Sequence, residues 1–342
     1  MFRTRLAGSV LAALTCAALV AGCSSDDPAE DPSSPAGASE DAGEDTGEDA
    51  GEDAADQGDD GQDTAGDGPE PGTELPEASG AFGDAPEFTF PDSGPPADLQ
   101  VEVLSEGDGP MVEPGAAVLA DYAGIVWGEQ DTFDDSYSRG AASLFSLSGV
   151  VQGWTEGIPE HPVGSRLLIS IPPELGYGPN GGQPDAGIGA EDTIVFVIDL
   201  VQTYNPDQAG QADASLTTEA ADLPVQVDGE LGEPATVTVA GDAAEPAEVE
   251  VITIAEGSGD PVAAGQSVAA AYAMSSWDGT SQVSSWPTDG EEGAGPFAGM
   301  IGQGYIVDAT VDIPVGSRVL VLVPANDAQP AAAWVLDILG TA

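Results

Sequence analysis

Residues 148–204 read SGVVQGWTEGIPEHPVGSRLLISIPPELGYGPNGGQPDAGIGAEDTIVFVIDLVQTY. The stretch opens with two valines before Trp154 and ends in an apolar run over residues 193–201. A short continuous run of β-branched residues is typical of a buried strand. Between the two ends lies a segment rich in glycine and proline that carries Tyr177. The pattern therefore predicts a loop with one aromatic side chain that leads into a closing strand.

The segments around this stretch predict a small α+β domain. Clusters of Gly, Pro, Asp and Ser separate short apolar runs, and one of these runs alternates apolar and polar side chains as a half-buried strand does. One or two helical turns fit only around residues 152–158. We expect a small antiparallel sheet with a short helix on its concave face over residues 97–204. Its predicted strands are residues 99–103, 118–124, 166–171 and 193–201.

The chain contains an internal repeat. The pentapeptide Pro-Val-Gly-Ser-Arg occurs at residues 162–166 and again at residues 314–318. Further segments match in the same order: 112–115 with 262–265, 199–201 with 337–339, and the lead-in 82–86 with 231–234. The sequence therefore predicts two tandem domains of the same fold, residues 81–204 and 223–342, joined by an acidic linker at 205–222.

The N-terminus has the pattern of a bacterial lipoprotein signal peptide. Arg3 and Arg5 precede an apolar run, residues 6–20, that is short for a membrane span. The run ends in Val-Ala-Gly-Cys, which resembles a lipobox. Residues 1–22 are therefore predicted to be a signal peptide and Cys23 to be the site of lipid attachment. The alternative is an ordinary cleaved signal followed by an incidental cysteine.

Residues 23–80 are predicted to form a disordered acidic tether. They consist largely of Asp, Glu, Gly, Ala, Pro and Ser, a composition that cannot bury enough apolar surface to fold. Such a tether would hold a folded module away from an anchored lipid. A Ca²⁺-binding acidic repeat is the alternative, but the residue spacing of an EF-hand loop is absent from the segment.

The charge of the chain excludes several classes of partner. With 61 acidic residues against five arginines and no lysine, the formal net charge is −56. Nucleic acids and anionic lipid surfaces require clustered cations, so neither is expected as a partner. Contact with a bilayer is expected only through the lipid on Cys23. The acidic excess indicates a high-GC or salt-adapted source, and we expect the protein on the outer face of a Gram-positive, actinobacterial membrane.

Few catalytic mechanisms are compatible with the residues present. His161 is the only histidine, so a His-activated nucleophile and metal sites with several histidines are not expected. No dinucleotide-binding, phosphate-binding or redox motif stands in a suitable context. We therefore expect neither a metal nor a cofactor, and the remaining chemistry is one that needs no ionised catalyst.

The first repeat resembles an FKBP-type (macrolide-binding) peptidyl-prolyl cis/trans isomerase over nearly all of residues 97–204. The family fold, an antiparallel sheet half-wrapped around one short helix, agrees with the fold predicted above. The resemblance rests on these motifs: Tyr122 in Ala-Asp-Tyr-Ala-Gly, Phe133-Asp134 followed by Arg139, Phe145-x-Leu147, Val150-Val151-x-Gly153-Trp154-x-x-Gly157, Pro-Val-Gly-Ser-Arg, Leu175-Gly176-Tyr177-Gly178 and Thr193-x-x-Phe196.

The resemblance implies a role for each of these positions. Trp154 would be the floor of a proline-binding pocket, and the Val151 N–H and the Tyr177 hydroxyl would hold substrate carbonyl groups. Asp134, paired with Arg139, would face the imide bond; the alternative for these two residues is a plain surface ion pair. For Phe145 and Phe196 the alternative to a pocket wall is a place in the hydrophobic core. The implied catalytic residues are Tyr122, Phe133, Asp134, Trp154 and Tyr177, and the implied substrate-binding residues are Arg139, Phe145, Val150, Val151, Ile188 and Phe196.

Both repeats depart from the family pattern. In the first, Ala142-Ser143 stands where the family has proline and an aromatic residue, which thins one wall of the pocket. The second keeps Tyr272 but has Val283-Ser284 and Tyr305-Ile306 near the positions of the Phe-Asp pair and the tryptophan, and it lacks the loop tyrosine. We therefore expect isomerase activity from the first repeat only, and a packing, spacing or protein-binding role for the second.

The sequence thus predicts a lipid-anchored peptidyl-prolyl cis/trans isomerase that assists the folding of secreted or envelope proteins. Its partners would be proline-containing polypeptides, with a macrolide as a candidate ligand. The alternative is an FKBP-like binding module or chaperone that holds proline-containing segments with little or no turnover.

Overall fold

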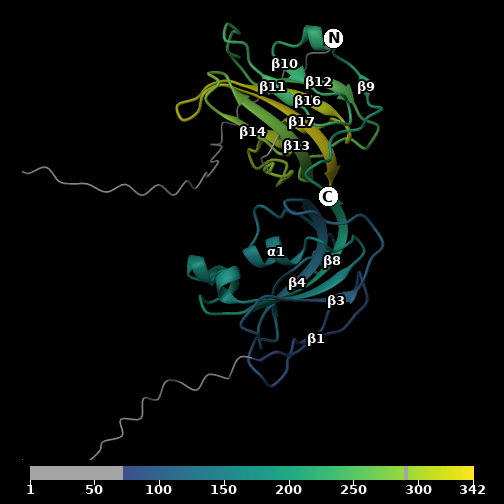
Figure 1. The fold of residues 1–342 in the computed structure, drawn as a ribbon, viewed down its shortest axis with the longest axis vertical. Helices are drawn as coiled ribbons and strands as arrows, with labels where there is room; N and C mark the ends of the chain where they lie inside the picture. Colours follow the sequence, from purple (N-terminus) through teal and green to yellow (C-terminus); the bar gives the residue numbers. More distant parts are fainter. Residues whose placement is uncertain (1–71, 289–291) are drawn as a thin grey trace, which may run out of the picture. The chain divides into compact units, whose positions relative to one another are not determined.

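The computed structural model describes residues 72–288 and 292–342 (Figure 1). The predicted signal peptide, the predicted lipid-attachment residue Cys23 and the predicted tether up to residue 71 lie outside the described residues. Within the two described ranges, no helix combines the length and the apolar character that crossing a membrane requires.

The first repeat folds into a six-stranded antiparallel sheet. Its strands are β3 (Gln100–Ser105), β4 (Ala117–Val126), β5 (Thr132–Asp135), β6 (Ser143–Ser146), β7 (Arg166–Ile171) and β8 (Ile194–Tyr204). They follow the order β3-β7-β8-β4-β5, with β6 paired to β4. β7 is buried along its whole length and β8 along most of it, which explains why these two segments are nearly continuous apolar runs.

All four predicted strands are present as β3, β4, β7 and β8, with ends shifted by no more than a few residues. Strands β5 and β6 were not predicted, because each is four residues long and lies among turn-forming residues. Both pair with β4. This pairing, which local sequence does not encode, brings the Phe133-Asp134 pair and Phe145 to the same central strand.

The predicted helix is confirmed as α1 (Gln152–Gly157; Figure 1). It packs against β7. Gly153 permits a close approach, because a Cβ atom built there would lie 2.5 Å from Cγ2 of Ile171. The loop between β7 and β8 contains the short 3₁₀ helices η1 (Pro173–Leu175), η2 (Gly178–Asn180) and η3 (Pro184–Ala186). These turns give the glycine- and proline-rich loop a defined path.

Arg166, the last residue of the first pentapeptide, is buried beneath residues 75–89, which are called the lead-in to the sheet from here on. Its Nη1 lies 3.0 Å from Oδ2 of Asp199 on β8. The guanidinium also donates hydrogen bonds to the carbonyl oxygens of Ala81 and Asp84, and the Gly83 N–H donates to Asp199 at 2.6 Å. The buried ion pair therefore fastens the lead-in to the sheet.

The lead-in also contains a two-stranded hairpin, β1 (Glu77–Ala78) and β2 (Phe88–Thr89). Apolar side chains of this segment, among them Leu75 and Phe88, pack against buried residues of the sheet. The folded structure therefore begins before residue 80, where the predicted tether was expected to end.

The second repeat contains a seven-stranded antiparallel sheet with the same strand order. Its strands are β9 (Ser215–Leu216), β12 (Glu250–Glu256), β13 (Ser267–Ser276), β14 (Gln282–Ser284), β15 (Phe297–Met300), β16 (Arg318–Val323) and β17 (Ala332–Thr341). The order β14-β13-β17-β16-β12, with β15 on β13, matches the first sheet strand for strand, and β9 adds an edge strand beside β12. A 3₁₀ helix, η5 (Ile306–Thr310), takes the place of α1 in the order of elements.

The second pentapeptide has the same structural use as the first. Arg318 and Asp337 are buried and joined by two hydrogen bonds, each of 2.7 Å. Arg318 also donates to the carbonyl oxygens of Gly229 and Glu233 in the lead-in to this repeat. A separate hairpin, β10 (Gln226–Asp228) and β11 (Thr236–Thr238), matches β1 and β2. The repeated pentapeptide is therefore a feature of the fold.

The linker predicted at residues 205–222 differs from the structure. Within it, β9 joins the second sheet, the Gly210 N–H donates to Asp337 at 2.8 Å, and the Gln211 N–H donates to the carbonyl oxygen of Gly316 at 2.9 Å. Its composition resembled a linker because its contacts are made by the backbone and by polar side chains such as Gln211 and Thr217, not by an apolar run. A short 3₁₀ helix, η4 (Ala220–Asp222), closes the segment.

Candidate active site

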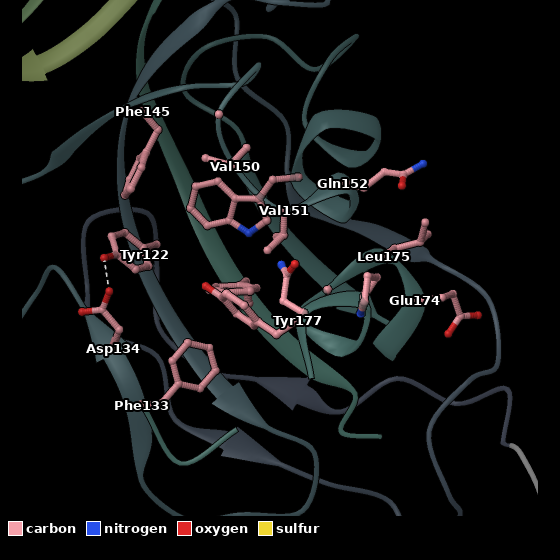
Figure 2. A pocket seen from close by; sticks show the side chains of 16 residues that line it. Tyr122, Phe133, Asp134, Phe145, Val150, Val151, Gln152, Glu174, Leu175 and Tyr177 are labelled. Carbon is pink, nitrogen blue, oxygen red and sulfur yellow. Dashed lines mark hydrogen bonds between the residues drawn. The ribbon is translucent and has the colours of Figure 1, made fainter. Parts of the chain in front are cut away.

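The first repeat contains a cavity of about 540 Å³ lined by residues of β4, β5, β8, α1 and the segments around them (Figure 2). Nine of the predicted site residues line it: Tyr122, Phe133, Asp134, Phe145, Val150, Val151, Trp154, Tyr177 and Phe196. The other lining residues were not predicted as site residues, although Leu175 and Gly176 belong to the motif around Tyr177; they are Gly149, Gln152, Glu174, Leu175, Gly176, Pro179 and Asn180. Most of these lie in the loop around η1 and η2, whose path depends on tertiary contacts.

Trp154 lies at the centre of a cluster of aromatic rings. Its ring centroid is 5.7 Å from that of Tyr122 and 5.1 Å from those of Phe145 and Phe196, and all three pairs meet edge to face. Phe133 meets Phe196 in the same way at 5.6 Å. Edge-to-face contacts are favourable and orient each ring. Trp154 lines the cavity and is only 3% exposed, so these ring contacts fix its position.

Gly124 on β4 makes room for two of these rings. A Cβ atom at this position would lie 2.5 Å from Cε1 of Phe196 and 2.6 Å from Cζ of Phe133. Real Cβ atoms do not approach other atoms so closely, so a larger residue would displace at least one ring. The glycine of the Ala-Asp-Tyr-Ala-Gly motif is therefore explained by the packing of the aromatic walls.

The polar edge of the pocket is a network of three side chains. The Tyr122 hydroxyl donates a hydrogen bond to Asp134 (Figure 2). Arg139 pairs with the same carboxylate and donates from Nη2 to the Tyr122 hydroxyl at 2.8 Å. Charge-assisted hydrogen bonds of this kind hold their partners in a defined orientation. The Asp134–Arg139 pair, expected from the motif, therefore also fixes the hydroxyl of a wall residue.

Both pocket tyrosines are protonated at neutral pH. Burial, assisted by the hydrogen bond to Asp134, raises the pKa of Tyr122 to about 12. Burial also raises the pKa of Tyr177 above its ordinary value, and the nearby Asp134 carboxylate adds to this. A raised tyrosine pKa favours the neutral form, so its contribution to stability is present below pH 10 and is lost as the pH rises towards 12. Both hydroxyls can therefore donate hydrogen bonds under physiological conditions.

Two hydrogen-bond donors remain available at the pocket, one from the backbone of Val151 and one from the side chain of Tyr177. Val151 is the N-cap of α1; its carbonyl accepts from the Trp154 N–H at 2.9 Å, whereas its own N–H has no partner among the described residues. Tyr177 lies between η1 and η2, half-buried in the pocket wall, and the N–H groups of Asn180 and Gly182 donate to its carbonyl. These contacts hold the loop while leaving the Tyr177 hydroxyl at the pocket.

Two predicted site residues do not line the cavity. Ile188 is 2% exposed and packs in the core of the first repeat, and its backbone exchanges two hydrogen bonds with Gln183. Arg139 reaches the site only through its contacts with Asp134 and Tyr122. Ile188 thus supports the loop from within, and Arg139 positions the polar edge.

The equivalent positions of the second repeat lack this arrangement. By strand register, Val283 faces Met274 where Asp134 faces Gly124, so no carboxylate stands there. Gly299 pairs with Val268 as Phe145 pairs with Val118. The ring of Phe297 covers this glycine, because a Cβ atom built at Gly299 would lie 2.4 Å from the Phe297 ring. Two aromatic residues do occupy equivalent positions, Tyr272 and Trp334, with ring centroids 5.7 Å apart. The second repeat retains the scaffold. Among its described residues there is no polar edge like that of Tyr122, Asp134 and Arg139, and no indole at the position of Trp154.

A pocket of this kind fits the apolar ring of a proline and surrounds it with aromatic walls. The description "FKBP-type peptidyl-prolyl cis-trans isomerase" belongs to the family model that matches residues 109–201. The chain is 40% identical to the "Probable FK506-binding protein" of Corynebacterium glutamicum, over 34% of this chain and 96% of that protein. It is 38% identical to the "FK506-binding protein" of Streptomyces anulatus, over 34% of this chain and 94% of that protein. The isomerase FkpA of Escherichia coli is 35% identical over 36% of this chain and 44% of its own length.

The fold, the aromatic pocket and these relatives together define a prolyl isomerase. The chain belongs to the family of FKBP-type peptidyl-prolyl cis-trans isomerases. The region that matches the family model lies in the first repeat, as the sequence predicted, and this repeat contains the pocket.

Proposed function

We propose that this protein is a lipid-anchored folding factor that isomerises X–Pro bonds of secreted or envelope proteins on the outer face of a bacterial membrane. The observation that carries the proposal is the aromatic pocket over Trp154, which has a hydrogen-bonded polar edge at Tyr122, Asp134 and Arg139. The anchor part of the proposal rests on the lipobox-like segment before Cys23.

The pocket would catalyse isomerisation by changing the environment of the imide bond. Rotation about a peptide bond faces a barrier of about 18–20 kcal/mol, because resonance makes the planar form rigid. The planar form is also the more charge-separated one, so an apolar pocket that excludes water favours the twisted form. No acid or base needs to be ionised for this effect, which agrees with the neutral hydroxyls at the site.

Each site residue then has a defined task. Trp154 supports the prolyl ring, and the Val151 N–H and the Tyr177 hydroxyl hold carbonyl groups on either side of the bond. Asp134, held by Arg139, faces the imide. The walls are Tyr122, Phe133, Phe145, Val150 and Phe196. Oriented donors and apolar walls together bind the twisted form better than the planar one, which is the requirement for catalysis.

The second repeat, residues 223–342 in the predicted boundaries, is proposed to be non-catalytic. Support comes from Val283 at the position of Asp134 and from Phe297, whose ring fills space near the position of Phe145. We assign to it a role in packing, spacing or protein binding. The segment before the first repeat is proposed to act as the tether between Cys23 and the catalytic domain.

A binding module with little turnover is the second candidate function. Ser143 favours it, because its small side chain on β6 stands where the family has an aromatic residue and leaves one wall thinner. Two relatives are named FK506-binding proteins, so a macrolide of that type is a candidate ligand for the same pocket. A catalytic and a purely binding role predict different kinetics.

The relaxation of an X–Pro peptide after a shift in its cis/trans equilibrium distinguishes these roles. Uncatalysed isomerisation takes roughly tens to hundreds of seconds. We expect the full chain at micromolar concentration to accelerate it clearly, and the acceleration to be competed by a macrolide. Peptide binding without acceleration would support the binding module and contradict the enzyme.

Membrane attachment is tested separately with Cys23→Ala. Only a thiol can carry the lipid thioether, so we expect the wild-type chain in the membrane fraction and the variant in the soluble fraction or the medium. Ser24→Ala is a matched control beside the site and should fractionate as the wild type does. If Cys23→Ala remains with the membrane, the lipid anchor is refuted whatever the isomerase activity.

A further inference from the structure

Glu174 is a charged residue of the pocket rim that the tasks above do not use. It is the middle residue of η1 and lines the cavity, and its side chain is exposed. Figure 2 shows Asp134 and Glu174 on opposite sides of Tyr177. The two carboxylates therefore border different parts of the pocket opening.

The two carboxylates differ in their partners. Asp134 is neutralised by Arg139. Glu174 forms no ion pair and no side-chain hydrogen bond within residues 72–288 and 292–342. The other two arginines in these ranges, Arg166 and Arg318, are buried and paired with their own aspartates. No described cation is therefore free to compensate Glu174.

We propose that Glu174 makes the pocket selective for X–Pro segments in which lysine or arginine lies beside the proline. This inference rests on the proposed use of the pocket as the substrate site. With the prolyl ring on Trp154, a neighbouring residue of the substrate lies at the rim. The long side chain of lysine or arginine can cover Leu175 with its methylene groups while its charge reaches the Glu174 carboxylate.

The charge of the whole chain acts in the same direction. A protein with a net charge of −56 attracts cationic segments and repels anionic ones before contact. This long-range effect is common to the entire surface, whereas Glu174 acts at the pocket. The two effects can be separated, because removal of one carboxylate changes the local interaction and leaves the overall charge almost unchanged.

The test compares peptides that differ only in the residue beside proline. One series has Lys, Gln or Glu before the proline, and a second series has them after it. Exchange measurements by NMR on the full chain give both the isomerisation rate and the affinity for each peptide. In at least one series we expect kcat/KM to fall from Lys to Gln to Glu, by about 1.5- to 5-fold per step at low salt, the size of an exposed charge interaction.

Four comparisons decide the outcome. At about 1 M salt, where the screening length is near 3 Å, the Lys-to-Glu ratio should approach one. Glu174→Gln should reduce the ratio at low salt, and Glu174→Arg should reverse it. Glu102→Gln, the same charge change at an exposed position on β3 outside the cavity, should keep the wild-type ratio.

The result that overturns the inference is a ratio in Glu174→Gln equal to that of the wild type, with turnover intact. That outcome would leave the proposed function standing. If instead no peptide is turned over but the affinities follow the order Lys, Gln, Glu and depend on Glu174, charge selection is confirmed and the enzymatic use of the site is refuted.

Discussion

Replacing Trp154 by alanine is expected to lower kcat/KM for X–Pro isomerisation by about 10- to 100-fold. The indole contacts the rings of Tyr122, Phe145 and Phe196. Its removal therefore takes away the proposed floor under the prolyl ring and admits water to the pocket. Loss of apolar contact worth about 1.5–3 kcal/mol in the transition state corresponds to a change of this size. The measurement is the catalysed relaxation of an X–Pro peptide over a range of enzyme concentrations.

The same substitution also costs stability, because truncating a buried tryptophan typically destabilises a domain by about 3–5 kcal/mol. Trp154→Phe keeps an aromatic ring at the floor and should show an intermediate rate with a smaller loss of stability. Trp334→Ala removes an indole from the second repeat, where it contacts Tyr272. This matched control should keep nearly the wild-type rate. A Trp154→Ala variant that is folded and fully active would contradict the assignment of the pocket.

Removing the carboxylate of Asp199 is expected to destabilise the first repeat by about 3–5 kcal/mol, the cost of leaving one member of a buried ion pair without its partner. Arg166 is 1% exposed, so its charge cannot turn to water in the Asp199→Ala variant. Burial raises the pKa of Asp199 despite its hydrogen bonds from Gly83 and Tyr137. Burying the charged pair therefore costs desolvation free energy. The hydrogen bonds that Asp199 accepts and Arg166 donates offset this cost.

The urea dependence of isomerase activity reports the unfolding of the first repeat and measures this effect. Because proteins are typically stable by only about 5–15 kcal/mol, the midpoint should move far towards lower urea. Asp337→Ala breaks the equivalent pair with Arg318 and should leave the midpoint for activity nearly unchanged. Replacing Arg166 and Asp199 together by apolar residues should recover part of the loss. An unchanged midpoint in Asp199→Ala would show that the pair does not hold the lead-in.

Local patterning was sufficient for much of the fold. The apolar runs at residues 166–171 and 193–201 identified β7 and β8 because buried strands require such runs. The repeated pentapeptide identified the second copy, and both sheets have the same strand order. The short strands β5 and β6, the hairpin before the first sheet and the packing of residues 205–222 escaped prediction. Each is fixed by contacts with the strands of its sheet, because none of these segments carries an apolar pattern of its own.

The candidate site divides in the same way. The sequence by itself determined the residue types of the pocket, since a Trp after two valines, a Phe-Asp pair and a glycine-flanked Tyr form a recognisable set of motifs. Only the tertiary structure decided that Ile188 supports the core and that Arg139 holds the Tyr122 hydroxyl. It also decided that Glu174 borders the opening without an ion-pair partner among the described residues. The physical reason is that residue type is a local property, whereas burial, partners and compensation of charge arise only when distant strands and loops meet.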